Sequence, residues 1–151
     1  MHVVVAGSGE LDAELRELAA GLELGENVSF VGFVNQSELP ALYGTCDVFV
    51  LPAEHEPWGL CVNEVMNAGL PLVLGAGVGC VADLLEPGVN GVTCEAGNPV
   101  SLAGALEPLL RDAELRRCMG EASRRSIATW DYEQCRLGVR AALASLGLLP
   151  A

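Results

Sequence analysis

The sequence predicts an α/β domain in which a doubly wound parallel sheet of about five strands is followed by C-terminal helices. Three features of its 151 residues predict this class. Short apolar runs alternate along the chain with segments of helical periodicity, these runs carry almost no polar residues, and the intervening segments are long enough for crossover helices. Unbroken apolar strands are typical of parallel sheets covered on both faces. Ligands of such folds bind beyond the carboxyl ends of the strands.

The first part of the chain predicts two strands and two helices. HVVVAG, residues 2–7, is a β-branched run that predicts a buried strand leading into Gly-Ser-Gly. Residues 10–24 place leucine and alanine at helical spacing and predict an amphipathic helix. VSFVGF, residues 28–33, predicts the second strand, and residues 37–43 predict a short helix that ends at Tyr43.

The middle of the chain continues the alternation. DVFVLP, residues 47–52, and LPLVL, residues 70–74, predict the third and fourth strands, with LCVNEVMNAG, residues 60–69, as the helix between them. After the glycine-rich GAGVG we expect a brief helix over residues 81–85, because a Pro-Gly turn at residues 87–88 then ends it.

The last third is predicted to be mostly helical. GVTC, residues 91–94, predicts a short fifth strand. Asn98 predicts a helix N-cap with Pro99 at the first helical position, which is a favoured pairing. From there, residues 99–147 predict two or three helical pieces.

Composition excludes several functional classes. The chain carries 20 acidic residues against 8 basic ones, a net charge of −12, and all its basic residues are arginine. Nucleic-acid affinity depends on cations that neutralise phosphates, so we expect no nucleic-acid binding. No apolar run approaches the roughly 20 residues needed to cross a bilayer, and no basic leader follows Met1. We therefore expect a soluble cytoplasmic protein without a membrane span.

The cysteines and histidines predict no metal site. The six cysteines are never closer than 14 residues in sequence, so no Cys-x-x-Cys redox or zinc pattern exists. We interpret them as small hydrophobic residues of a reducing compartment. His2 and His55 are too few and too far apart to form a metal site.

Two glycine-containing loops could approach an anion. AGSGELD, residues 6–12, begins like a dinucleotide fingerprint, but Asp12 stands at the third glycine position and acidic residues in the first turn repel phosphate. In EHEPWGLCVNEV, residues 54–65, Gly59 begins a helix without an acidic first turn. The amides of Trp58, Gly59 and Leu60 could point at a phosphate, so this is the better anion site.

Two glutamates bracket that second loop. Glu56 and Glu64 lie on either side of the helix start. Helical side chains lean towards the helix N-terminus, so Glu64 should reach back towards the loop that carries Glu56. Hydroxyl acceptors beside phosphate donors suit a sugar-phosphate ligand. The alternative is an ordinary amphipathic helix with a solvated polar stripe.

LPAEHEPWGLCVNEVMNAGLPLV, residues 51–73, resembles the glutamate, seven residues, glutamate motif of retaining group 1 glycosyltransferases of GT-B architecture. The resemblance continues in VVVAGSGELDAELRELA, VSFVGFV, ELPALYGTCDVFVLP, EPGVNGVTCEAGNPVSLAGAL and ATWDYEQC, all in the order typical of the family. It covers nearly the whole chain and points to the C-terminal, donor-binding half, a Rossmann-like domain.

The resemblance implies roles for individual residues. Glu56 would contact donor-sugar hydroxyls and stabilise positive charge at the anomeric carbon, and Glu64 would accept hydrogen bonds from the ribose. The backbone of Trp58, Gly59 and Leu60 would meet the sugar and the diphosphate. The turn formed by Gly32, Phe33 and Val34 would lie at the edge of the base. A nucleotide-diphosphate sugar would bind, a hexose-type sugar would be transferred with retention, and no metal or other cofactor is implied.

The sequence also departs from the family pattern. Gly79-Cys80 replaces a usual glycine pair and Ala82-Asp83 a usual Pro-Glu, which affects the sugar contacts expected at residues 77–83. The family's phosphate-binding arginine and lysine follow a strand for which this chain has no counterpart. We therefore expect residues 1–151 to be a single nucleotide-sugar-binding domain without the N-terminal acceptor domain or the first strand of its own domain, and inactive alone.

Other functions remain open. The same fold could serve as a non-catalytic nucleotide-binding or interaction domain, or as half of a GT-B epimerase or hydrolase. The hypothesis of a dinucleotide-dependent dehydrogenase is weakened because Asp12 stands where the dinucleotide fingerprint has its third glycine. Apolar residues on the helix expected over residues 130–146 could leave an exposed face, which would favour self-association of the isolated chain.

Overall fold

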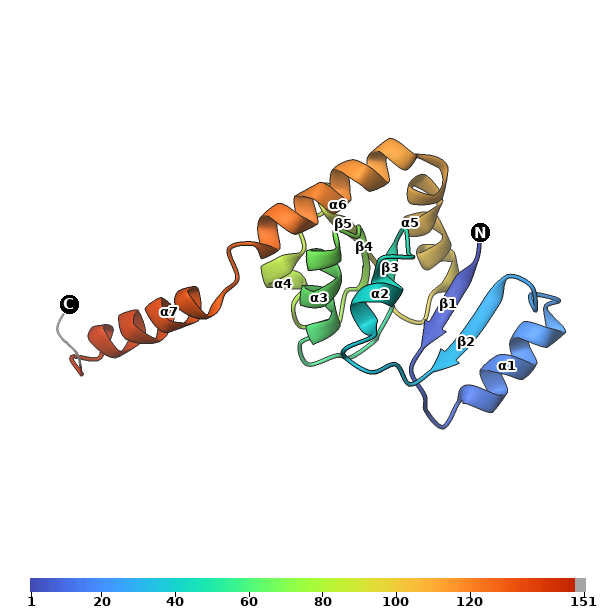
Figure 1. Ribbon diagram of the computed structural model, residues 1–151, viewed down its shortest axis with the longest axis horizontal. Helices are drawn as coiled ribbons and strands as arrows, with labels where there is room; N and C mark the ends of the chain where they lie inside the picture. Colours follow the sequence, from blue (N-terminus) through green and yellow to red (C-terminus); the bar gives the residue numbers. More distant parts are fainter. Residues whose placement is uncertain (149–151) are drawn as a thin grey trace. The chain divides into compact units, whose positions relative to one another are not determined.

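A computed structural model describes residues 1–148 of the protein (Figure 1). Residues 149–151, the end of the predicted domain, lie outside this range. The chain forms two compact units, Met1–Gly44 and Thr45–Ala151. All the predicted strands and helices are present, in the predicted order. Each strand is parallel to its sheet partners, which confirms the α/β class. The five strands that the structure describes in residues 1–148 are divided between a two-stranded and a three-stranded sheet.

The first unit is a β-α-β segment followed by a short helix. Its elements are β1 (Val3–Ala6), α1 (Asp12–Gly21), β2 (Val28–Gly32) and α2 (Leu39–Tyr43). Strands β1 and β2 pair in parallel, and helix α1 connects them.

The prediction of a buried first strand is wrong for this structure. Val3 and Val4 are 41% and 37% exposed, and within residues 1–148 the only sheet partner of β1 is β2. A central strand of a parallel sheet has neighbours on both edges and helices on both faces. Strand β1 has a partner on only one edge, so its apolar residues stay partly accessible.

The second unit contains the three-stranded sheet. Its elements are β3 (Phe49–Leu51), α3 (Leu60–Ala68), β4 (Leu72–Gly75), α4 (Val81–Leu84) and β5 (Gly91–Cys94). Strand β4 is central, between β3 and β5, and all four of its residues are buried. The unbroken apolar sequence of β4 fits this position, since both faces of the strand are covered.

Three helices complete the second unit: α5 (Pro99–Arg111), α6 (Ala113–Ile127) and α7 (Tyr132–Ser145). Asn98 caps α5 as predicted, because its side chain accepts hydrogen bonds from the amides of Val100 and Ser101, both at 3.1 Å. Helix α5 packs on β4 and β5, and α6 packs on α3. Within residues 1–148, no helix combines the length and apolar character that crossing a membrane requires.

Helices α3 and α6 meet with very little space between their backbones. A Cβ atom added to Gly120 of α6 would lie 2.1 Å from the carbonyl oxygen of Gly69, which ends α3. The hydroxyl of the fully buried Ser123 donates to the carbonyl of Leu70 at 2.8 Å. The Arg124 guanidinium donates to the carbonyl of Ala68 at 2.9 Å and so satisfies the C-terminal end of α3. Helix α6 therefore fixes the position of α3.

Candidate functional site

The candidate site lies where β3 ends and α3 begins. Residues 52–59 connect the two elements, and Gly59 is the N-cap of α3 with a φ of 89°, in the left-handed region. A Cβ atom there would lie 3.2 Å from Val78 Cγ1. A non-glycine residue would therefore be strained by its backbone and crowded by its neighbour. The predicted helix start at Gly59 is confirmed.

The Glu56 carboxylate bonds to the beginning of α3. Its Oε1 atom accepts hydrogen bonds from the amides of Trp58 and Gly59 at 3.2 and 3.1 Å. In this structure the two amides are thus occupied by the Glu56 carboxylate, and their binding of a phosphate stays a prediction. The physical reason is local: a carboxylate two residues before Trp58 can fold back onto amides that have no acceptor within the helix. Leu60 is the first residue of the helix, and its side chain is exposed.

The glycine-rich loop after β4 supports the Glu56 loop from behind. Gly79 donates its amide to the carbonyl of Glu56 at 2.8 Å, and Cys80 donates to the carbonyl of Trp58 at 3.0 Å. A Cβ atom added to any of three alternate glycines would collide with a backbone carbonyl oxygen of the Glu56 loop. The distances from the added Cβ are 2.3 Å for Gly75 to Ala53 O, 2.0 Å for Gly77 to Glu54 O and 2.0 Å for Gly79 to Pro57 O. Glycine at every second position thus lets the two loops pack backbone against backbone.

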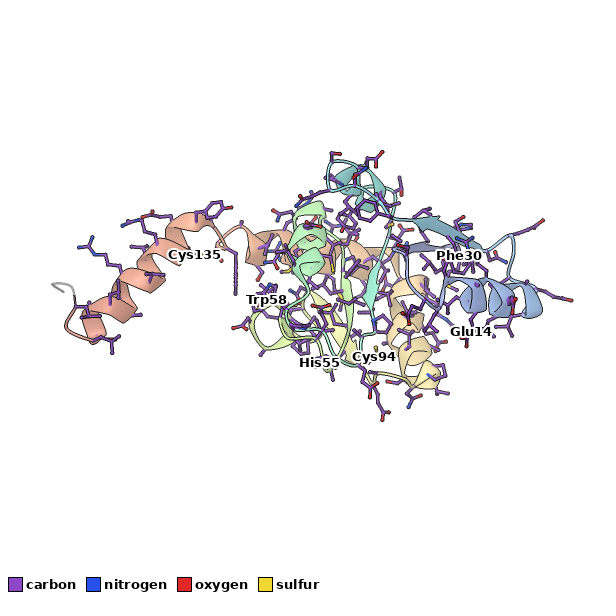
Figure 2. The ribbon with its side chains drawn as sticks, turned by 90° about the horizontal axis from the view of Figure 1, so that it is seen from below. Glu14, Phe30, His55, Trp58, Cys94 and Cys135 are labelled. Atoms are coloured by element: carbon purple, nitrogen blue, oxygen red, sulfur yellow. The ribbon has the colours of Figure 1, made fainter. Side chains whose placement is uncertain are left out.

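Helix α3 separates its faces as predicted. Val62, Val65 and Met66 are fully buried, whereas Glu64 is partly exposed on the opposite side. The side chain of Asn63 accepts a hydrogen bond from the indole N–H of Trp58 at 3.0 Å. This bond joins the polar stripe of α3 to the Glu56 loop. His55 and Trp58 of that loop are labelled in Figure 2.

The two glutamates act on a common neighbour. Burial raises the pKa of the Cys61 thiol, and the negative charges of Glu56 and then Glu64 raise it further. Both carboxylates are thus within electrostatic range of the first turn of α3. Burial also raises the pKa of the Cys80 thiol to about 11. That the two glutamates share one hollow remains a prediction.

We expect alkaline pH to destabilise the protein through Cys80. This thiol stays protonated in the folded protein up to a pKa of about 11, against 9.0 for an ordinary thiol. The unfolded chain therefore loses its proton first, and the free energy of unfolding should fall as pH rises from about 9 towards 11. The fall should be about 2 kcal/mol. Urea denaturation at pH 8 and pH 10.5 would measure it, and Cys80→Ala should reduce the difference while Cys135→Ala, at an exposed position, should not.

The residues expected at the edge of the base lie in the first unit. Gly32 ends β2 with a φ of 68° and accepts a hydrogen bond from the amide of Gly7 at 2.8 Å. Phe33 is 76% exposed, and Val34 is partly buried. Gly32 therefore makes the turn, as its left-handed conformation requires. A role for these residues in binding the base stays a prediction.

One contact of the site was missed from the sequence. The ring centroids of Trp58 and Trp130 lie 6.0 Å apart, with an angle of 41° between the ring planes. The only sequence signal is that these are the two tryptophans of the chain. No spacing rule connects residues so far apart. Among residues 1–148, no cluster of three or more metal-ligating side chains could hold a metal ion.

A helix that begins at a glycine beyond the carboxyl end of a parallel strand is typical of the place where α/β domains bind their ligands. Residues 1–126 match the family described as glycosyl transferases group 1, and the chain belongs to that family. This confirms the resemblance seen in the sequence and agrees with the GT-B type of fold.

Individual proteins support the assignment. An uncharacterized glycosyltransferase of Methanocaldococcus jannaschii is 33% identical over 132 residues, covering 85% of this chain and 34% of its own length. The Anabaena protein HepE, solved with UDP and glucose, is 26% identical with a TM-score of 0.81, covering 95% of this chain and 40% of HepE. The solved C-terminal domain of a group 1 glycosyl transferase from Francisella tularensis shares the fold, with a TM-score of 0.72 at 22% identity, covering 80% of this chain and 62% of that domain. The chain spans about a third of the length of the curated relatives it matches.

Proposed function

We propose that this chain is the donor-binding half of a retaining glycosyltransferase, which binds a nucleotide-diphosphate sugar and transfers a hexose-type sugar to an acceptor. The observation that carries the proposal is the junction of the Glu56 loop with α3, where the amides of Trp58 and Gly59 donate to the Glu56 carboxylate, and Glu56 and Glu64 are both within electrostatic range of Cys61. Membership of the glycosyltransferase family and the UDP and glucose bound by the similar HepE support it. Six cysteines without a Cys-x-x-Cys spacing fit work in the reducing cytoplasm.

Glu56 would change partners when the donor binds. In the structure its carboxylate accepts the amides of Trp58 and Gly59. A diphosphate is an anion of the same kind and could take those amides. The released carboxylate would then bind donor-sugar hydroxyls and stabilise the positive charge that develops at the anomeric carbon. The amides of Trp58 and Gly59 would thus bind one anion, the Glu56 carboxylate, before the donor arrives and another, the diphosphate, afterwards.

Glu64 would bind the ribose. It lies on a helix whose opposite face is fully buried, so its backbone has little freedom to move. A carboxylate is an acceptor with two oxygens and can receive both hydroxyls of a ribose. The turn of Gly32, Phe33 and Val34 would contact the base.

The site lacks the cations that a diphosphate needs. Residues 53–80 contain three carboxylates, Glu54, Glu56 and Glu64, and neither arginine nor lysine. Backbone amides contribute partial charges only, so full positive charges must come from elsewhere. We propose that an acceptor-binding domain and a further strand, which are not among these 151 residues, supply them. The isolated chain should then bind nucleotide weakly and transfer no sugar at a measurable rate.

A titration with UDP tests the proposed function. We expect Glu64→Gln to weaken UDP binding about 10-fold, because hydrogen bonds to a charged group exceed those to a neutral one by about 1.4 kcal/mol. Calorimetry, or NMR chemical shifts followed up to millimolar UDP, would measure the dissociation constants of the natural chain and of Glu64→Gln for UDP. Glu107→Gln, on an exposed part of α5 where Glu107 pairs with Arg111, is the matched control and should leave the affinity unchanged.

Three results would count against the proposal or a part of it. If neither the natural chain nor the variant binds UDP or another nucleoside diphosphate, the interaction-domain alternative gains support. If Glu64→Gln and Glu107→Gln bind UDP equally well, the ribose role of Glu64 is wrong. Efficient sugar transfer by the 151 residues alone would overturn the requirement for another domain.

A further inference from the structure

Besides the hydrogen bond that its carbonyl accepts from the amide of Cys80, Trp58 has three further interactions at the candidate site. Its amide donates to the Glu56 carboxylate at 3.2 Å, and its indole N–H donates to Asn63 of α3 at 3.0 Å. Its ring packs against Trp130 with the centroids 6.0 Å apart. Backbone, indole nitrogen and ring are therefore each fixed by a different segment of the second unit.

Trp130 itself is held in a short, ordered linker. Its amide donates to the carbonyl of Ile127 at 2.9 Å, at the end of α6. The next residue, Asp131, caps α7 by accepting the amide of Gln134 at 2.8 Å. Trp130 is 45% exposed as a residue, so it is not a core residue. Helix ends on both sides limit the positions that this ring can take.

Helix α7 provides no buried core against which the aromatic ring of Trp130 could pack. No residue of α7 is buried, and Figure 1 shows the helix continuing beyond the end of α6. Tyr132, the first residue of α7, is 95% exposed. Of the two aromatic residues in this region, Trp130 and Tyr132, only Trp130 has a ring contact within residues 1–148, and that contact is with Trp58.

We propose that Trp130 is a positioning residue for the donor site: by packing on the ring of Trp58, it holds the amides of Trp58 and Gly59 in the direction that receives an anion. The proposal rests on the proposed function, because the anion in question is the diphosphate of the donor. The contact of Trp130 with the candidate site is the one with the ring of Trp58, so we expect its effect on the amides to pass through Trp58. The linker between α6 and α7 thereby influences a site that lies more than seventy residues earlier in the chain.

The first test reads the contact and the amides directly, without nucleotide. Two indoles this close and tilted couple their transitions, and the resulting pair of circular-dichroism bands near 230 nm should be lost in both Trp130→Ala and Trp130→Phe. Hydrogen exchange followed by NMR should show the amides of Trp58 and Gly59 exchanging about 2- to 10-fold faster in Trp130→Ala, the range expected for an aromatic pair. Trp130→Phe should restore slow exchange, and Tyr132→Ala should change neither signal.

The second test measures the consequence for binding. The dissociation constant for UDP should rise about 2- to 10-fold in Trp130→Ala, recover in Trp130→Phe and stay unchanged in Tyr132→Ala. The melting temperature identifies a variant that is merely unstable, since a general loss of stability would not be rescued at the site by phenylalanine.

The outcomes separate this proposal from the proposed function. Unchanged exchange of Trp58 and Gly59 in Trp130→Ala, or a natural chain without coupled indole bands, would overturn the positioning role. If the natural chain binds no nucleotide, the proposed function fails, while exchange still decides whether Trp130 positions the loop. If exchange accelerates but UDP affinity does not change, the amides are not the phosphate donors and the proposal is overturned.

Discussion

Gly77→Ala is expected to lower the free energy of unfolding by about 3 kcal/mol, the upper part of the range for overpacking at a close contact. The added Cβ atom would lie 2.0 Å from the carbonyl oxygen of Glu54. This neighbour is backbone, so relief requires movement of the loops themselves. The hydrogen bond from Gly79 to the carbonyl of Glu56, at 2.8 Å, lies next to the collision and should weaken too. Urea denaturation monitored by circular dichroism would measure the loss.

Gly104→Ala provides the matched control for Gly77→Ala. Gly104 lies within α5, and a Cβ atom there meets nothing within 4 Å. Alanine is the better helix former by about 1 kcal/mol, so this variant should be equal to or more stable than the natural chain. Equal effects of the two substitutions would show that the loops after β3 and β4 are not packed backbone against backbone. Because the Glu56 loop is one of the two, Gly77→Ala should also weaken UDP binding.

Asn90→Ala should cost about 2 to 4 kcal/mol of unfolding free energy through buried groups left without partners. Asn90 is 1% exposed. Its Oδ1 atom accepts the amide of Glu86 at 2.8 Å, and its Nδ2 atom donates to the carbonyl of Leu84 at 2.8 Å. Alanine removes both bonds and leaves a small cavity. Since the side chain ties the end of α4 to the start of β5, denaturant and thermal unfolding should both register the loss.

Asn67→Ala makes the same substitution where it should cost little. Asn67 is exposed on α3, and its side chain donates to the carbonyl of Asn63 at 2.9 Å. Water can replace that bond and alanine favours the helix, so the change should stay within about 0.5 kcal/mol. A cost at Asn90 no greater than at Asn67 would contradict the buried bonds described for Asn90.

Local signals explain why most of the fold could be predicted from the sequence. Asn98 and Pro99 mark the start of α5 because a cap and a fixed φ act within one turn. Gly69, in the left-handed conformation, is the C-cap of α3, so the helix ends at Ala68, one residue before the predicted end at Gly69. Both faces of α3 follow from the spacing of its apolar residues. Such features depend on neighbours three or four residues away, which a sequence displays directly.

Features that depend on distant partners could not be predicted in the same way. The apolar sequence of β1 indicates a strand but not how many neighbours it has, so its exposure was not foreseen. The occupied amides at Trp58 and Gly59 depend on the rotamer of Glu56. The Trp58–Trp130 contact joins residues with no regular spacing. Alternate glycines at residues 75–79 did carry a signal, and close backbone approach is its physical meaning.

The close approach of Gly120 to the carbonyl of Gly69 bears on how a ligand could enter the site. At this contact the two backbones meet directly, and the side chains of Ser123 and Arg124 bond to the carbonyls at the end of α3, so we expect α3 to move little against α6 and Glu64 to be carried on a rigid support. The Glu56 loop is held just as closely by the glycines behind it. Adaptation to an incoming molecule is then left to side-chain torsions, chiefly those of Glu56, and should occur on the fast timescale of rotamer changes rather than that of domain closure.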